Sequence, residues 1–179
     1  VSAPVGDDFK LERVGRVLAA QEMRLVNGEI FVKGPGVFAG YWKNPEATAK
    51  KIVDGWYQTG DAGWVDEDGH LIYWDRVEEL IPLADGTKFA PQFIEVRLRF
   101  SPYLKDAMAV GGEGRPFVSA IIDMDFRNVG KWAEKHHIPY TTFTDLSQKP
   151  QVLELVKNDV ERVNRLLPEA ARIKRFVNL

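Results

Sequence analysis

Short apolar runs separated by tight turns fill the first part of the sequence and constrain its fold most strongly. Residues 23–26 and 29–33 flank Asn27-Gly28, a dipeptide typical of two-residue β-hairpin turns. Two further short runs flank Asp66-Glu67-Asp68-Gly69, which predicts a second hairpin. Neighbouring hairpins of this kind predict a small, mainly antiparallel β subdomain.

Helical and extended patterns alternate in the rest of the sequence. Asn44 before Pro45 predicts a short helix with a side-chain cap, and Pro91 predicts the start of another. We expect the second of these helices to bury Phe93, Val96 and Phe100 along one stripe. The expected helices are 45–50, 92–100, 125–136 and 149–167, and the expected strands outside the first subdomain are 81–83, 88–90, 107–111 and 117–122. This order indicates an α+β fold with a small sheet flanked by helices.

The charge balance changes along the chain and suggests two domains. Residues 1–75 carry 8 basic and 12 acidic side chains, whereas residues 76–179 carry 16 and 14. We therefore expect one domain over 1–75, ending at a hinge, and a second over 76–179.

Composition excludes several kinds of site. The sequence has no cysteine, so disulfides, thiolate metal sites and cysteine nucleophiles are ruled out. A net charge of −2 argues against a nucleic-acid partner, and no apolar run approaches the roughly 20 residues of a membrane span. His136 and His137 are adjacent and cannot share a helix face, so no metal site is predicted.

Several short motifs follow one another in a recognisable order. They are Gly28-Glu29-Ile30, Gly40-Tyr41-Trp42, Pro45-Glu46-Ala47-Thr48, Asp54-Gly55-Trp56-Tyr57-Gln58-Thr59-Gly60-Asp61 and Asp75-Arg76. In this order and spacing they resemble the adenylate-forming enzymes. The motif Leu83-Ala84-Asp85-Gly86, followed by Ala90-Pro91, is most similar to the corresponding sequence of long-chain fatty acyl-CoA synthetases. The resemblance implies ATP-dependent activation of a fatty acid to an acyl-adenylate, followed by thioester formation with coenzyme A.

Asp61 and Arg76 are the candidate nucleotide-binding residues. A carboxylate accepts hydrogen bonds from both hydroxyls of a ribose, and a guanidinium offers five donors to anionic groups. By resemblance, Asp61 holds the ribose of ATP and of the acyl-adenylate, and Arg76 contacts its ribose or phosphate side. The plainer alternatives are a turn cap for Asp61 and a surface salt bridge for Arg76, with Asp75 or Glu79 as partner.

The resemblance also implies a hinge and a mobile lid domain formed by 76–179. The hinge comprises Asp75 and Glu78, with Glu78 as the pivot, although it is also interpretable as an ordinary loop glutamate. The loop with Asp85, Gly86 and Lys88 faces the coenzyme A side in such enzymes, or is an ordinary hairpin tip. Pro82 stands where relatives often carry a lysine, and proline offers no cation.

Other functional parts of such enzymes are expected outside this sequence. The phosphate-binding loop lies upstream in relatives and the catalytic lysine lies beyond residue 179, so we assign no catalytic residue. ATP, Mg²⁺ and coenzyme A are expected for the full-length parent, with no cofactor bound to the fragment, which is expected to be inactive alone. The implied partners are small molecules: fatty acid, ATP and coenzyme A. The implied location is cytoplasmic, with peripheral membrane contact left open, and the oligomeric state is not predicted.

Two other functions remain open from the sequence. The chain is alternatively a stand-alone, lid-like binding module, or part of an aryl- or amino-acid-adenylating enzyme. The aromatic residues of the first zone, which include Tyr41, Trp42, Trp56, Tyr57, Trp64 and Trp74, are interpreted as core and turn packing rather than a base-stacking platform.

Overall fold

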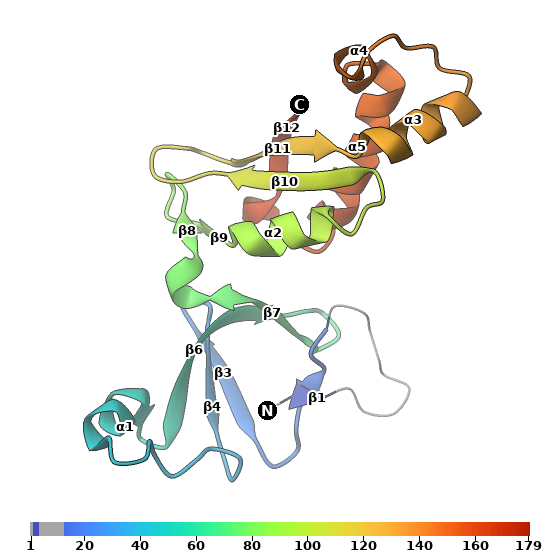
Figure 1. Ribbon diagram of the computed structural model, residues 1–179. Helices are drawn as coiled ribbons and strands as arrows, with labels where there is room; N and C mark the ends of the chain where they lie inside the picture. The colour runs from blue at the N-terminus through green and yellow to red at the C-terminus, as the bar shows by residue number, and fades with distance from the viewer. Residues whose placement is uncertain (1, 4–12) are drawn as a thin grey trace. The chain divides into compact units, whose positions relative to one another are not determined.

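The computed structural model describes residues 2–3 and 13–179 (Figure 1). The chain forms two compact units, one ending at Glu79 and one running from Leu80 to Leu179. Each unit is described by itself below.

The first unit is built on an antiparallel sheet, as predicted. Its strand order is β3-β4-β6-β5, and β7 pairs with β6. A separate two-stranded ladder joins β1 to β2. The strands are β1 (Ser2–Ala3), β2 (Arg16–Val17), β3 (Glu22–Val26), β4 (Glu29–Lys33), β5 (Ile52–Val53), β6 (Trp56–Val65) and β7 (Leu71–Arg76).

Turn chemistry accounts for both predicted hairpins of this sheet. Asn27 and Gly28 join β3 to β4 with φ of 52° and 81°, the left-handed geometry of a two-residue turn that matches strand twist. The second hairpin joins β6 to β7 through Asp66-Glu67-Asp68-Gly69, where the Asp66 carboxylate accepts the backbone N–H groups of Asp68 and His70. Both hairpins are therefore confirmed.

Helix α1 (Pro45–Lys51) leads into β5 and starts where the sequence predicts. The Asn44 side chain accepts a hydrogen bond from the N–H of Ala47, and Pro45 occupies the first turn. The cap satisfies a backbone donor that would otherwise lack a partner at this helix end.

The small core of the first unit lies against β4. Ile30, Val32 and Leu71 are buried there, and Met23, Val37 and Tyr57 pack against them. The expectation that the aromatic residues serve as packing is wrong for Trp42, whose side chain is 88% exposed. It holds for Trp64 and Trp74, whose rings meet edge to face at 5.6 Å.

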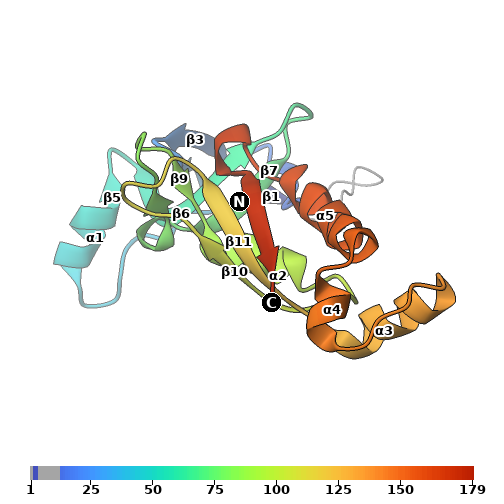
Figure 2. The same ribbon diagram turned by 90° about the horizontal axis from the view of Figure 1, so that it is seen from above.

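The second unit combines a three-stranded sheet with four helices among the described residues, which confirms the α+β prediction (Figures 1 and 2). β10 pairs antiparallel with β11, and β11 pairs parallel with β12. The short 3₁₀ segment η1 (Val77–Glu79) precedes this unit. The elements of the second unit are β8 (Ile81–Pro82), β9 (Lys88–Phe89), α2 (Pro91–Leu98), β10 (Leu104–Val110), β11 (Val118–Met124), α3 (Phe126–Lys135), α4 (Phe143–Ser147), α5 (Pro150–Asn164), η2 (Glu169–Ala171) and β12 (Ile173–Asn178).

Alternation along β11 divides the sheet into a buried and an open face. Val118, Ala120, Ile122 and Met124 are buried, whereas the residues between them are partly exposed. Helix α5 supplies the facing apolar stripe with buried Val152, Val156, Val160 and Val163. The core of this unit therefore lies between one sheet face and its helices.

The predicted buried stripe of α2 is correct for Phe93 and wrong for Val96 and Phe100. Phe93, Ile94 and Leu98 are buried, whereas Val96 is 40% exposed and Phe100, beyond the helix end, is 68% exposed. The helix faces the core through the Ile94–Leu98 row, one turn apart, and this row leaves Val96 on the solvent side. Helix α4, capped by Thr142, was not predicted, and neither was the start of β12 beside exposed Lys174 and Arg175.

Candidate nucleotide-binding site

Two predicted site residues meet on neighbouring strands of the first unit. Asp61 of β6 and Arg76 of β7 are direct partners in the strand register. Arg76 Nη1 donates to Asp61 Oδ1 at 2.5 Å and to the carbonyl oxygen of Thr59 at 3.3 Å. The side chains are 33% and 50% exposed, so the pair lies at the surface, open to a ligand.

A bulge in β6 positions Asp61. The register pairs Glu29 with Ala62 but Phe31 with Gln58, so Thr59, Gly60 and Asp61 together face the single residue Ile30. An insertion of this kind bends the strand and re-aims its side chains. Gly60 has φ of 76°, a conformation that costs glycine little.

Side-chain hydrogen bonds hold this bulge in place. The Thr59 hydroxyl donates to the carbonyl oxygen of Ile30 at 2.7 Å and accepts the N–H of Asp61 at 3.0 Å. Glu29 Oε1 accepts the N–H of Gly60 at 3.1 Å. These bonds replace the strand pairing lost at the bulge, so Asp61 is presented from a fixed backbone. Glu29 lies inside the motif Gly28-Glu29-Ile30, but nothing in the sequence pattern predicts its contact with Gly60.

A small pocket of about 200 Å³ opens beside the bulge. Asp61 and Thr59 line its polar side. The other lining residues are Val14, Ile30, Val32, Leu71 and Tyr73. Drug-sized ligands occupy roughly 300–1,000 Å³, so this pocket suits one part of a larger ligand.

The negative charge of Asp61 affects the protonation of two neighbouring side chains, Arg76 and Tyr73. The hydrogen bond and charge of Asp61 raise the pKa of Arg76 above its usual value, so this guanidinium stays cationic. Burial, followed by the charges of Asp61 and Asp75, raises the pKa of Tyr73. The Tyr73 phenol is therefore neutral at physiological pH.

The predicted hinge residues occupy the end of β7 and the 3₁₀ segment that follows. Asp75 Oδ1 accepts the N–H of Arg76 at 2.8 Å, while Asp75 Oδ2 is buried without a hydrogen-bond partner. Glu78 is exposed in η1. The alternative of a surface salt bridge for Arg76 is matched in kind, but its partner is Asp61 rather than Asp75 or Glu79.

The predicted loop of Asp85, Gly86 and Lys88 lies in the second unit. The loop forms the tip of the β8–β9 hairpin, where Asp85 Oδ1 accepts the N–H of Thr87 at 2.9 Å. This bond lowers the pKa of Asp85. Asp85, Gly86 and Lys88 are all exposed, and no described contact gives them a role beyond the turn.

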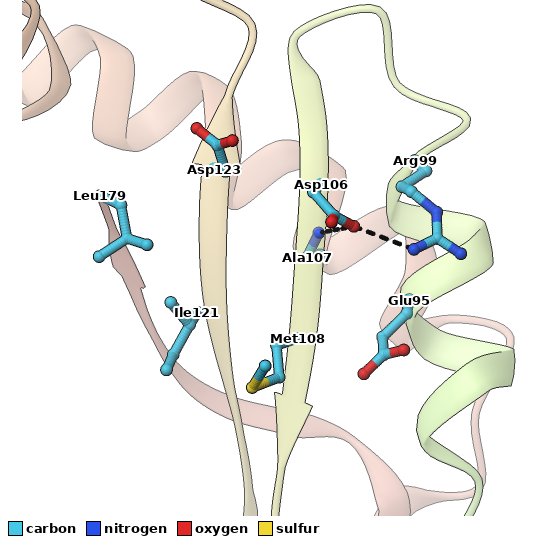
Figure 3. Close-up of a pocket in the computed structure, with 8 residues that line it drawn as sticks. All are labelled: Glu95, Arg99, Asp106, Ala107, Met108, Ile121, Asp123 and Leu179. Carbon is cyan, nitrogen blue, oxygen red and sulfur yellow. Dashed lines mark hydrogen bonds and ion pairs between the residues drawn. The ribbon is translucent and has the colours of Figure 1, made fainter.

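A second pocket, of about 330 Å³, lies on the open sheet face of the second unit (Figure 3). Its carboxylates already have partners: Asp106 pairs with Arg99 at 2.9 Å, and Glu95 accepts the N–H of Ala109 at 2.9 Å. The Arg99 guanidinium lowers the pKa of Asp106. Asp123, the third carboxylate, pairs with Lys105 at 3.1 Å. The arrangement offers no free base for proton transfer.

Metal binding and membrane insertion find no support among residues 2–3 and 13–179. Those residues contain no group of three or more His, Asp or Glu side chains that could hold a metal ion. Every helix in the same part of the chain is too short or too polar to cross a bilayer. His136 is exposed and stacks on Trp132 at 4.4 Å, as a surface residue does.

Comparison with known proteins relates both units to one family of enzymes. The family model described as "AMP-binding enzyme C-terminal domain" matches residues 78–177. The long-chain-fatty-acid–CoA ligase FadD15 of Mycobacterium tuberculosis is 34% identical over 95% of this chain. Long-chain-fatty-acid–CoA ligase 1 of Cavia porcellus is 35% identical over 92%. The chain spans only 28% and 25% of the lengths of these two relatives.

A solved structure supports the same fold. O-succinylbenzoate coenzyme A synthetase (MenE) from Bacillus subtilis, in complex with AMP, superposes with a TM-score of 0.55 and 22% sequence identity. The match covers 97% of this chain and 33% of that protein. At this level of identity the match shows that the chain shares the fold of the corresponding region of that protein.

Proposed function

The chain belongs to the family of AMP-binding enzyme C-terminal domains, and we propose that it is the carboxy-terminal part of a long-chain fatty acid–CoA ligase. Such an enzyme joins a fatty acid to AMP with ATP as donor, releasing pyrophosphate, and then transfers the acyl group to coenzyme A. The observation that carries the proposal is the pairing of Asp61 with Arg76 beside a small pocket.

Asp61 binds the ribose in this proposal. One carboxylate oxygen is engaged by Arg76, and the carboxylate keeps further lone pairs for ribose hydroxyls. The bulge fixes the backbone of Asp61 before a ligand binds. Binding therefore costs little conformational entropy at this residue. Arg76, cationic at every physiological pH, lies at the same position to contact the ribose or the phosphate side.

The two compact units suit a lid that moves on a hinge. We retain the functional boundary after residue 75, with Asp75 and Glu78 as hinge residues and Glu78 as the pivot. Glu78 is exposed and lies one residue before the last residue of the first unit, so a change of its backbone angles disturbs no core. The exposed loop with Asp85, Gly86 and Lys88 is the proposed coenzyme A side of the lid.

The proposed reaction defines the ligands and the compartment. The parent requires ATP, coenzyme A and a fatty acid, with Mg²⁺ neutralising the charge on the phosphates. No catalytic lysine is assigned within this chain. A protein without cysteine suits a reducing compartment, so we propose the cytoplasm, with peripheral contact to the membrane that supplies the acids.

An assay of the protein encoded by the complete reading frame tests the function. We expect pyrophosphate release and acyl-CoA formation with acids of graded chain length, fastest with long alkyl chains. Asp61→Ala should impair both half-reactions, because the ribose is held throughout, whereas Asp68→Ala in the β6–β7 turn should spare both. An enzyme that accepts only amino or aryl acids would refute the fatty-acid assignment.

The aryl-acid alternative is favoured by a solved structure and by a sequence relative, since the 2-succinylbenzoate–CoA ligase of Bacillus cytotoxicus is 43% identical over 58% of this chain. The solved structure described above has an aromatic substrate in its name, and its fold is shared over nearly the whole chain. Fold similarity at 22% identity does not carry substrate choice, whereas the two long-chain-fatty-acid–CoA ligases described above each match over more than 90% of the chain.

A further inference from the structure

A second cation lies beside the β6 bulge, next to the Asp61–Arg76 pair. Lys51 is the last residue of α1, and its side chain is half-buried. A methyl group placed on Gly60 would lie 3.6 Å from Lys51 Nζ and 3.3 Å from Arg76 Nη2. The ammonium and the guanidinium therefore converge on the same face of Gly60.

Lys51 has no ion-pair partner among the residues that the structure describes. The two carboxylates of the site have other partners, because Asp61 pairs with Arg76 and Glu29 accepts the N–H of Gly60. A half-buried lysine without a counter-ion indicates a site that attracts an anion.

Gly60 keeps this face of the bulge open. Any other residue would extend its Cβ into the space in front of the two cations, and would also be strained at φ of 76°. The opening has one carboxylate for hydroxyl groups and two cations for an anion. A nucleoside phosphate carries both kinds of group on one sugar.

We propose that Lys51 binds the phosphate of the nucleotide whose ribose Asp61 holds. Its long stem and three donors suit a phosphate oxygen approached from the side. The inference deepens the proposed function and rests on it. The motif resemblance gave no signal for Lys51, since helix α1 and the bulge lie close only after β5 pairs with β6.

The plainer explanation is that Lys51 serves only its helix. Cations in the last turn interact favourably with the helix dipole, and Lys50 and Lys51 both lie there. Lys50 is exposed and lies on the same helix with the same charge. It is therefore the matched control for a phosphate contact that only Lys51 should make.

Titration of the protein encoded by the complete reading frame with adenosine and with AMP, followed by isothermal titration calorimetry, tests the proposal. We expect both ligands to bind to this protein, and AMP to bind more tightly than adenosine. Lys51→Gln should weaken AMP binding roughly three- to tenfold, the loss of about one charge-assisted hydrogen bond, and leave adenosine binding unchanged. Lys51→Arg should retain most of the AMP affinity, and Lys50→Gln should retain all of it.

The outcomes separate this inference from the function on which it rests. Equal AMP affinities in Lys51→Gln and Lys50→Gln would overturn the phosphate contact while leaving the ribose site intact. Asp61→Asn should weaken adenosine and AMP alike. A chain that binds neither ligand, or an Asp61→Asn variant that binds both normally, would overturn the ribose site and the Lys51 contact together.

Discussion

Arg76 Nη1 lies 2.5 Å from Asp61 Oδ1, and the same two residues are paired in register across β6 and β7. The strand pairing brings the two side chains together without any loop having to close. Because a large part of each side chain is exposed, water screens their attraction. The pair is therefore suited to exchanging partners with a ligand rather than to holding the fold.

Replacement of Arg76 by Gln separates these two roles. We expect the free energy of unfolding, measured by urea denaturation, to change by less than about 1 kcal/mol, as is typical of exposed ion pairs. AMP affinity should fall, because a cation at the binding site is lost. Arg99→Gln, which breaks the exposed Arg99–Asp106 pair of the second unit, should match it in stability and leave AMP binding unchanged. A loss of several kcal/mol for Arg76→Gln would make the pair structural.

Substitution of Gly60 by Ala tests the open face of the bulge. The left-handed φ of 76° costs a residue with a Cβ about 1–2 kcal/mol, and the new methyl group would push Arg76 aside. Gly86→Ala is the matched control, since Gly86 has φ of 82° and open space around its Cβ position. We expect similar losses of unfolding free energy in both variants, but loss of AMP binding only in Gly60→Ala. Normal AMP binding by Gly60→Ala would count against the geometry described.

Local chemistry explains what the sequence predicted correctly. The turn at Asn27-Gly28 and the cap at Asn44 depend on neighbouring residues, so their patterns are visible in the sequence. The bulge at Thr59 to Asp61 was not visible, because it exists only in the register between β4 and β6. Lys51 was missed for the same reason.

The buried face of α2 shows a second limit. The sequence offers apolar side chains around most of this helix, so periodicity alone does not choose between the Val96 and Ile94 sides. Packing against β10 and α5 decides, and it buries Ile94 and Leu98. The order of the motifs indicated the family and the candidate residues, but the contacts of Asp61 required the fold.

Thr59→Val tests the side-chain bonds that hold the bulge. Valine keeps the shape but removes the hydroxyl that donates to Ile30 and accepts from Asp61. Removing the hydrogen-bond partner of a partly buried polar group lowers the free energy of unfolding by about 1–3 kcal/mol, a change that urea denaturation would detect. Thr59→Ser keeps the hydroxyl and should lose much less. Equal losses in the two variants would show that the methyl group, rather than the hydrogen bonds, matters.

The Asp66 carboxylate should make stability depend on acid pH. Burial alone would raise its pKa, but hydrogen bonds from His70 and Arg13 bring the pKa below the usual value of 3.8. A carboxylate with a lowered pKa in the folded state stabilises fully above the unfolded value and loses this contribution as the pH falls below it. We therefore expect the unfolding free energy to decrease below about pH 4.

Asp66→Asn provides the comparison for that pH dependence. The variant should be less stable at neutral pH by about 1–3 kcal/mol, because its amide replaces the charged acceptor for Arg13. Its stability should then fall less steeply in acid than that of the unchanged protein. Parallel pH profiles for the two proteins would exclude Asp66 as a source of the acid sensitivity.

Gly111→Ala tests the packing of the second unit. A methyl group on Gly111 would lie 2.4 Å from Cε1 of Phe89 and 3.1 Å from Cδ2 of Leu83, and both of these side chains are buried. Overpacking of this kind typically costs about 1–3 kcal/mol in the free energy of unfolding. Phe89→Leu removes the clashing ring edge, so the double variant should lose less stability than the sum of the two single variants. If the losses of unfolding free energy in the two single variants simply added up in the double variant, the backbone at Gly111 would be moving away from Phe89 without strain. The close contact between Gly111 and Phe89 would then not determine the stability of this unit.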